Sequence, residues 1–308
     1  MTVFSARIGV DLGGTKIEAA LINNAGIIVQ SKRITTPSGS YRDVVEAIRD
    51  LVLSLENQAG ARCSVGVATP GAISPATGLI KNANSTRLNG HKLDSDLAAT
   101  LDRPIRLAND ADCFALSEAT DGAGAGAQTV FGTILGTGVG GGLVVRGKLL
   151  SGPNAIAGEW GHSPLPWPAD DERPGAACYC GRRGCIETFL SGPSLSREHA
   201  EATGMTLSAT EIAARAGTGD PAANNTLQRY EDQLARSLAT VINLVDPYVI
   251  VLGGGLSRIA RLYENVPRRW GRYVYSDTVT TKLLPPRYGD SSGVRGAAWL
   301  WGSGASPE

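Results

Sequence analysis

The chain has 308 residues, of which 42% are hydrophobic and 19% charged, a balance typical of a soluble globular protein. Its 29 basic residues match its 29 acidic ones, and a neutral chain is poorly suited to nucleic acid or an anionic membrane. No apolar run reaches the roughly 20 residues of a membrane span. The N-terminus lacks the features of a signal peptide, so we expect a cytoplasmic protein with reduced thiols.

The first 120 residues predict a mixed sheet flanked by helices. Residues 6–34 read as three antiparallel strands separated by Gly and Asn turns. A helix is expected at 40–58, where apolar residues recur at helical spacing. Strands follow at 63–72 and 103–110, and a helix is expected from residue 111 to 123.

The stretch from residue 128 opens a second unit that resembles the first. VDLGGTKIEAALINNAG and TILGTGVGGGLVVRGK both read as strand, Leu-Gly turn with a Thr, strand and turn. This internal repeat predicts two related α/β domains. Further on, helices are expected at 187–201, 207–217, 221–245 and 293–302, and a buried strand at 248–253.

The two Leu-Gly turns are candidate phosphate-binding sites. Glycines let backbone N–H groups approach a phosphate closely, Thr15 adds a hydroxyl, and Asp11 can reach a phosphate-bound Mg²⁺. Either turn alone is equally consistent with a tight hairpin that needs positive φ. Two similar turns, one with a carboxylate, favour a shared clamp. The residues are Asp11, Gly13, Gly14, Thr15 and Lys16 in the first turn and Gly136, Thr137 and Gly138 in the second.

A third glycine cluster, Gly253, Gly254 and Gly255, follows the apolar strand at 249–252. Glycines here allow a flat adenine or a ribose to lie against the backbone. An ordinary strand-to-helix turn is the alternative. None of the three clusters matches the P-loop pattern G-x-x-x-x-G-K-[ST].

Asn109 and Asp110 stand where a strand meets a helix. They fit an ordinary helix N-terminus, with a capping side chain and an acidic first turn. They also fit a site in which Asp110 accepts a proton from a substrate hydroxyl and Asn109 binds a neighbouring one. A helix N-terminus lowers a carboxylate pKa, which weakens the base but keeps it ionised.

Cys178, Cys180 and Cys185 lie within eight positions, shortly after the His162 of GEWGH. Three thiolates and one imidazole form a standard closed zinc set. A disulfide and free thiols are the alternatives, and a reducing compartment and surface oxidation disfavour them. Such a structural Zn²⁺ ties the cysteine loop to residues 158–162. Cys63 and Cys113 are expected in the core, and His91 and His199 at the surface.

The zinc set would gather Glu159, His162 and Glu187 around one pocket. A histidine that binds metal through one ring nitrogen can donate from the other. Two carboxylates and an imidazole N–H suit a polyhydroxylated ligand such as a sugar.

The motifs DLGGTK, GTGVGGG, DPYVIVLGGG and CYCGRRGCIE, together with GEWGH, resemble those of the ROK family, a group of actin/hexokinase-like sugar kinases. The resemblance implies an α/β fold of two domains with ATP and Mg²⁺ in the cleft between them. The small domain would comprise residues 1–118 plus 290–308. Residues 119–289 would form the large domain, with the zinc loop and the nucleoside site.

The resemblance also implies roles for individual residues. Asp110 would be the catalytic base, and Glu159, His162 and Glu187 would contact the sugar. His162 and the three cysteines would hold zinc. The family typically has Asn where this chain has Asp112, which bears on local hydrogen bonding. ROK kinases are often dimers, so the resemblance allows a homodimer, but the sequence leaves the oligomeric state open.

Three stretches, 81–90, 161–167 and 289–301, are similar to the bacterial ROK fructokinase subgroup. They predict ATP-dependent 6-phosphorylation of D-fructose, with mannose as a second substrate and Asn84 as a sugar contact or a turn former. N-acetylglucosamine kinases, which resemble this chain in the glycine hairpins and at 107–118, and glucokinases are the alternatives.

Two other classes of function are alternatives to an enzyme. ROK repressors carry a helix-turn-helix domain ahead of the kinase-like part, and only six residues precede the first expected strand. A sugar sensor without catalysis would be expected to lack Asp11 or Asp110, and both are present. The sequence therefore favours an enzyme.

Overall fold

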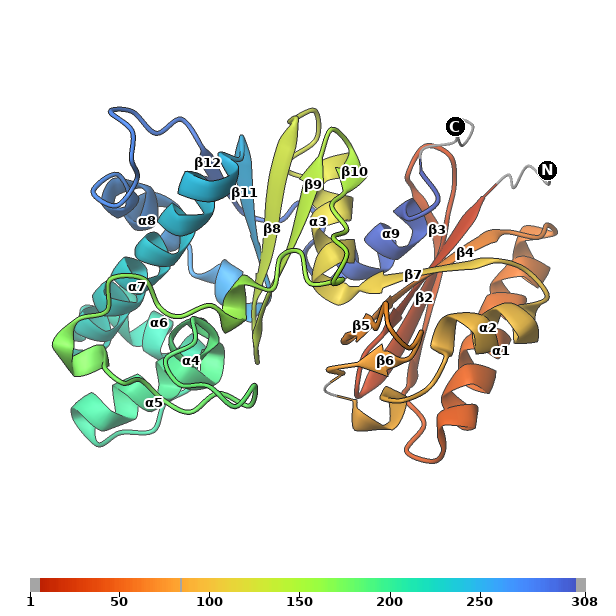
Figure 1. The fold of residues 1–308 in the computed structure, drawn as a ribbon, viewed down its shortest axis with the longest axis horizontal. Helices are drawn as coiled ribbons and strands as arrows, with labels where there is room; N and C mark the ends of the chain where they lie inside the picture. Colours follow the sequence, from red (N-terminus) through yellow and green to blue (C-terminus); the bar gives the residue numbers. More distant parts are fainter. Residues whose placement is uncertain (1–5, 84, 303–308) are drawn as a thin grey trace.

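The computed structural model describes residues 6–83 and 85–302, which form two α/β units along the long axis of the molecule (Figure 1). Each unit contains a five-stranded mixed sheet. The strand orders are β3-β2-β1-β4-β7 and β10-β9-β8-β11-β12, so the second sheet repeats the first strand for strand. The predicted α/β class and the internal repeat are both confirmed.

In the first sheet, an antiparallel meander is followed by two strands that run parallel to β1. Its strands are β1 (Arg7–Leu12), β2 (Lys16–Ile22), β3 (Ile28–Thr35), β4 (Ser64–Thr69) and β7 (Ile105–Asn109). Helices α1 (Tyr41–Ala59) and α2 (Leu93–Leu101) bury their apolar faces in the same core as β1 and β4. A small hairpin of β5 (Ala72–Ile73) and β6 (Ile80–Lys81), which the sequence does not predict, lies between β4 and α2.

The periodicity of α1 explains its position. Its buried residues recur three or four positions apart, from Val44 through Ile48 to Leu55, so they share one face. The helix begins at a capping box formed by Ser40 and Asp43 and ends at Gly60, whose φ of 61° is left-handed.

The second unit carries more helices than the first. Its strands are β8 (Thr129–Leu135), β9 (Val139–Val145), β10 (Lys148–Leu149), β11 (Val249–Gly253) and β12 (Lys282–Leu284). Its helices are α4 (Glu187–Leu190), α5 (Gly192–Thr203), α6 (Ala209–Gly217), α7 (Pro221–Val245) and α8 (Leu262–Trp270). The single helix expected at 187–201 is two, because the Ser191 side chain caps a new helix that has Pro193 in its first turn.

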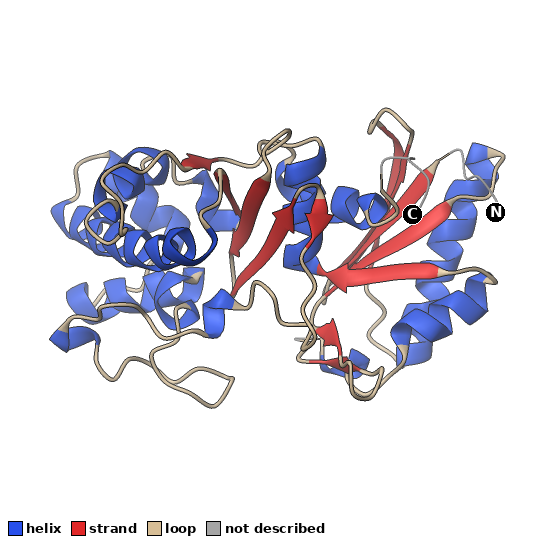
Figure 2. Ribbon diagram, turned by 45° about the horizontal axis from the view of Figure 1, so that its top comes forward, coloured by secondary structure: helices blue, strands red, loops and turns tan. Residues whose placement is uncertain are grey.

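Two helices lie between the sheets, α3 (Asp110–Thr120) and α9 (Ser292–Trp299) (Figures 1 and 2). Glycines in the strands bring them close: a Cβ at Gly9 would overlap the backbone of α9, and one at Gly132 would lie 2.7 Å from the Cα of Ala115 in α3. The C-terminal helix thus packs on the first sheet, whereas α3 packs on the second. A Cβ at Gly296 would overlap the carbonyl of Cys113, so α3 and α9 also touch each other.

The two halves of the repeat differ in charge at equivalent positions, and one of them lies at the end of the first strand of each sheet. Asp11 is the second-last residue of β1, and Ile134 is the second-last residue of β8.

Within the described ranges, no helix has both the length and the apolar character needed to cross a bilayer.

Candidate active site and metal centre

A cavity of about 430 Å³ lies at the C-terminal edge of the first sheet. Its walls include residues 11–15, Pro70, residues 85–87 and Asp110. Asp11 and Asp110 are far apart in sequence, but β1, β4 and β7 are parallel neighbours, so their C-terminal ends share one edge. The structure therefore brings together the first glycine turn and the predicted base.

Burial perturbs both carboxyl groups. It raises the pKa of Asp11 to about 6, and the nearby carboxylates of Asp110 and Glu18 add to the rise. Burial is also the main cause of the raised pKa of Asp110, with Glu159 adding to it, while the Ala111 N–H opposes it. Water still reaches the Asp110 side chain, so the carboxylate is open to a ligand although protein surrounds it.

Asn109 caps α3, which agrees with the interpretation of this stretch as an ordinary helix N-terminus. Its Oδ1 accepts a hydrogen bond from the Ala111 N–H at 2.9 Å, and its Nδ2 donates to the carbonyl of Gly71 at 3.0 Å. The same Ala111 N–H lies 2.8 Å from Asp110 Oδ1. Capping fixes the direction in which α3 starts and hence the place of Asp110.

The glycines of the two candidate phosphate turns do not adopt the left-handed backbone conformation that would require glycine. Neither Gly13 and Gly14 nor Gly136 and Gly138 have positive φ. A Cβ at Gly14 would meet open space, and Thr15 and Thr137 are exposed at the tips of their turns. A Cβ at Gly13, by contrast, would lie 2.9 Å from the Lys16 carbonyl, so the tight hairpin itself accounts for Gly13. The free backbone at Gly14 allows close approach of a ligand.

The third cluster, Gly253 to Gly255, lies at the end of β11. A Cβ at Gly253 would lie 2.6 Å from the ring of Phe114, and Gly254 has φ 76°. Gly254 and Gly255 are exposed, and a short 3-10 helix begins at Gly255. Two of these glycines are thus required by the fold itself, and Gly254 and Gly255 leave exposed backbone without side chains at this end of β11.

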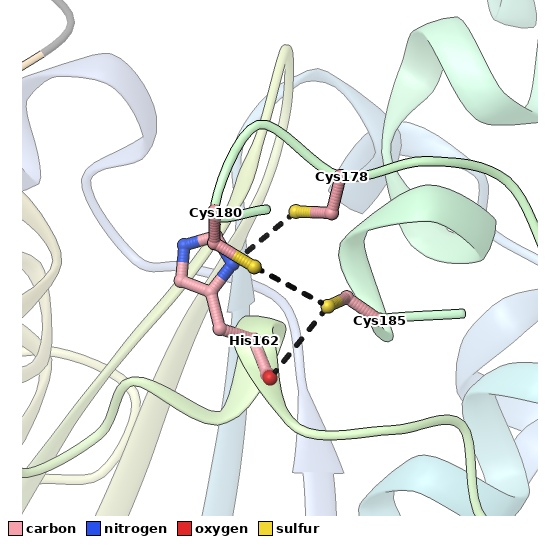
Figure 3. A group of neighbouring side chains, drawn as sticks. All are labelled: His162, Cys178, Cys180 and Cys185. Carbon is pink, nitrogen blue, oxygen red and sulfur yellow. Dashed lines mark hydrogen bonds between the residues drawn. The ribbon is translucent and has the colours of Figure 1, made fainter. Parts of the chain in front are cut away.

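The predicted metal ligands converge. The ligand atoms of His162, Cys178, Cys180 and Cys185 all lie within 4.8 Å of one another (Figure 3). His162 Nδ1 lies 3.5 Å from Cys178 Sγ, and the sulfurs of Cys180 and Cys185 are 3.6 Å apart. A tetrahedral zinc ion with bonds of about 2.3 Å places its sulfur ligands about 3.8 Å apart. The four side chains fit Zn²⁺ held through Nδ1 of the histidine.

Backbone hydrogen bonds also hold the cysteine loop. Leu165 N–H donates to the Gly184 carbonyl at 2.9 Å, and Ile186 N–H donates to the Ser163 carbonyl at 2.8 Å. The loop is thus joined to the segment after His162 by peptide groups as well as by the candidate metal ligands.

The other ring nitrogen of His162 has a partner that sequence reasoning missed. Its Nε2 lies 2.9 Å from the hydroxyl of Tyr179, whose ring meets the imidazole edge-on. With Nδ1 on a metal, Nε2 carries the proton and donates to this oxygen. A sugar hydroxyl at the same position has to displace Tyr179.

The remaining predicted sugar residues lie near by. Glu159 is exposed, and it lies close enough to Asp110 for its charge to raise the pKa of that carboxyl group. Glu187 Oε2 accepts a hydrogen bond from the Val139 N–H at 2.9 Å. Asn84 lies outside the described residues. Pro70, Thr86 and Arg87 also line the cavity, although the sequence analysis names none of them as a site residue; Thr86 and Arg87 belong to the 81–90 stretch that resembles fructokinases.

Of the two histidines expected at the surface, His91 is exposed but His199 is not. His199 is fully buried where α5 meets α7, and its Nδ1 lies 2.9 Å from Thr226 Oγ1. The expectation failed because helix packing decides the burial of an isolated histidine, and its neighbours in sequence do not reveal that packing.

Three comparisons place the chain among known proteins. The sequence profile of the ROK family matches residues 7–303. An N-acetyl-D-glucosamine kinase of Yersinia pseudotuberculosis is 40% identical over 296 residues, covering 95% of this chain and 97% of that protein. The ROK hexokinase of Thermus thermophilus is 30% identical with a TM-score of 0.84, covering 95% of this chain and 96% of that one.

A ROK family glucokinase from Streptomyces griseus, solved in complex with glucose and AMPPNP, is 28% identical. Its TM-score is 0.78, and the match covers 96% of this chain and 98% of that one. The architecture is the actin/hexokinase-like fold. The family profile spans nearly the whole sequence, and the Yersinia relative, 40% identical, covers 95% of this chain. The chain therefore belongs to the ROK family.

Proposed function

We propose that this protein is an ATP-dependent kinase that phosphorylates the primary hydroxyl of a hexose. The observation that carries the proposal is the single cavity shared by Asp11, the exposed Gly13–Thr15 turn and Asp110. A phosphate-binding turn, a carboxylate suited to a metal ion and a candidate base are the parts that phosphoryl transfer needs.

In this proposal Asp110 accepts the proton of the attacking hydroxyl. Phosphoryl transfer depends mainly on positioning and charge stabilisation, and the capped start of α3 positions this carboxylate. Its raised pKa makes it a better proton acceptor than an ordinary aspartate. Asp11 would bind Mg²⁺ directly or through water, and the ion would neutralise phosphate charge.

The same proposal assigns the rest of the site. The turns at 13–16 and 136–138 hold the phosphates, and the turn at Gly253–Gly255 holds the nucleoside. The sugar lies between Asp110 and the zinc-loop side, where it meets Asn84, Asn109, Glu159, His162 and Glu187. The zinc ion is structural, since four protein ligands leave it no open position.

N-acetyl-D-glucosamine is the first substrate to test, because relatives 38–40% identical over 296 residues carry that kinase name. This changes the ranking made from sequence, which put fructose first. D-fructose is the second candidate, favoured by the resemblance of residues 81–90, 161–167 and 289–301 to fructokinases. The two candidates differ at C1 and C2: N-acetylglucosamine is an aldose with an acetamido group at C2, whereas fructose is a ketose with its carbonyl carbon at C2.

A substrate panel decides between them. ADP release is measured with N-acetylglucosamine, fructose, mannose, glucose and N-acetylmannosamine, and kcat/KM is compared across the five. We expect the highest value with N-acetylglucosamine. A highest value with fructose reverses the ranking but keeps the kinase, whereas no turnover with any hexose, in a protein that still binds sugar, contradicts the kinase proposal.

A further inference from the structure

The second phosphate turn is held by the segment that follows the cysteine loop. Val139 N–H donates to Glu187 Oε2 at 2.9 Å, and Gly192 N–H donates to the Gly136 carbonyl at 2.7 Å. Glu187 begins α4, two residues after Cys185. Both ends of the turn therefore rest on residues 187–192.

Gly138 makes this contact possible. A Cβ at this position would lie 2.7 Å from Glu187 Oε2, closer than side-chain atoms approach one another. The backbone of Gly138 is not left-handed, so its conformation does not require glycine. A larger residue here would displace the carboxylate of Glu187 from its present position.

The backbone of Glu187 is fixed as well. Its carbonyl accepts hydrogen bonds from Ser191 N–H at 3.2 Å and Ser194 Oγ at 3.1 Å. The second carboxylate oxygen, Oε1, has a long contact of 4.0 Å with Cys178 Sγ. One oxygen is thus committed to the phosphate turn, and the other faces the zinc-loop side.

We propose that Glu187 is a positioning residue for the nucleotide: the hydrogen bond that its side-chain oxygen accepts from the Val139 N–H fixes the 136–139 turn in the conformation that receives phosphate. This inference deepens the proposed function and rests on it for the identity of the ligand. A sugar hydroxyl bound to Oε1 would restrain the same carboxylate that braces the turn. Sugar and nucleotide would therefore bind with positive coupling, and the coupling is reciprocal.

Amide hydrogen exchange of the ligand-free protein tests the brace without reference to activity. Glu187→Ala removes the acceptor of the Val139 N–H, and we expect exchange in residues 136–142 to be about tenfold faster, the effect of losing one hydrogen bond. Glu187→Gln keeps an acceptor oxygen and should stay close to wild type. Glu201→Ala, which removes an exposed carboxylate from α5, is the matched control and should change nothing in the turn.

Binding of a non-hydrolysable ATP analogue, measured by calorimetry without sugar, gives the functional readout. The expected dissociation constant is about tenfold higher for Glu187→Ala and near wild type for Glu187→Gln, while both variants bind hexose more weakly. Gly138→Ala should resemble Glu187→Ala, and adding it to Glu187→Ala should cost little more, because the two changes break one contact.

The outcomes separate the two proposals. If the wild type binds no ATP analogue, the proposed function fails, and the exchange data still decide whether Glu187 braces the turn. If Glu187→Ala leaves both the exchange rate and the analogue affinity unchanged, the brace is refuted while the kinase stands. If Glu187→Gln is as damaging to the turn as Glu187→Ala, charge rather than the Val139 hydrogen bond controls it, and the inference is overturned.

Discussion

Asp110 is subject to opposing influences on its pKa. Burial and the charge of Glu159 favour the protonated form, whereas the Ala111 N–H at the start of α3 favours the carboxylate. Burial dominates, so the pKa is raised even though helix N-termini ordinarily lower it. A base at this position keeps more affinity for a proton than sequence reasoning alone suggests.

If Asp110 accepts the hydroxyl proton, Asp110→Asn should lower kcat by about 10² or more. The amide is nearly isosteric and can still accept from the Ala111 N–H, so folding should be preserved. Steady-state kinetics and a thermal melt of the same preparation check this. A variant that folds normally and retains wild-type kcat would exclude Asp110 as the base.

Asp112 predicts a pH-dependent stability. Burial, followed by the charges of Glu159 and Asp110, raises its pKa to about 7 in the folded protein. A raised carboxyl pKa means that the native state binds the proton more tightly than the unfolded chain, so stability falls as pH rises from about 4 to about 7. One of its oxygens, Oδ1, is buried without a hydrogen-bond partner among the described residues.

We therefore expect Asp112→Asn to stabilise the fold at pH 8, by roughly 1–3 kcal/mol, since each pKa unit corresponds to about 1.4 kcal/mol. At pH 4 the advantage should vanish, because the carboxyl group is then protonated. Urea unfolding at both pH values measures the difference. Equal effects of the substitution at pH 4 and pH 8 would contradict the assignment.

Individual site residues could be predicted where a short motif carries the chemistry. Asp11, Asp110 and the four zinc ligands belong to such motifs, and the structure brings each set together. The contact between Glu187 and Val139 could not be predicted, because it joins a side chain to a backbone group 48 positions away. Nothing in either local sequence signals that partner.

Among the elements, the cysteine loop has two independent supports. Peptide hydrogen bonds join it to residues 163–165, and the candidate ligands join it to His162. Removal of a metal ion should therefore loosen the loop without unfolding the domain, since the apolar core of the second unit does not depend on these side chains.

Untreated protein should contain about one zinc per chain, the stoichiometry of one closed four-ligand site. A chelator should lower the melting temperature and the affinity for hexose while the far-ultraviolet circular dichroism stays nearly constant. Cys180→Ser should show the same loss without chelator, and chelation of that variant should add nothing. Metal analysis that finds no zinc in active, untreated enzyme would contradict the site.

Elements were predictable where one periodicity dominates. The amphipathic α7 matches its predicted range, and the glycine hairpins appear as expected. The β5–β6 hairpin has strands of two residues each, which are too short to show an alternation of apolar and polar residues. The break at Ser191 was missed because capping and apolar periodicity compete there, and capping prevails.

At the scale of the whole molecule, the two sheets are connected through the packing of α3 against α9. These helices approach so closely that a Cβ on Gly296 would overlap the backbone carbonyl of Cys113. Sequence patterns predicted both helices but could not show that α3 packs on the second sheet, because such packing depends on contacts between distant segments. The proposed limits of the two domains remain a prediction.

Gly296→Ala should force α3 and α9 apart and destabilise the protein by about 1–3 kcal/mol, the usual cost of overpacking a close interface. Since Asp110 begins α3, kcat should fall as well. Gly217→Ala is the matched control, because that glycine lies in a helix with open space around its Cβ position. Unfolding in urea and steady-state kinetics measure both effects, and equal behaviour of the two variants would show that the helices can separate without cost.

The two sheets repeat one strand order, yet matching positions of the two halves differ in charge. Asp11 and Ile134 occupy the same place in β1 and β8, and only the aspartate can attract a divalent cation. An anionic donor spanning the two halves would accordingly settle in one of two otherwise comparable orientations. The direction of group transfer would then depend on Asp11, because the matching residue of the other half, Ile134, is aliphatic.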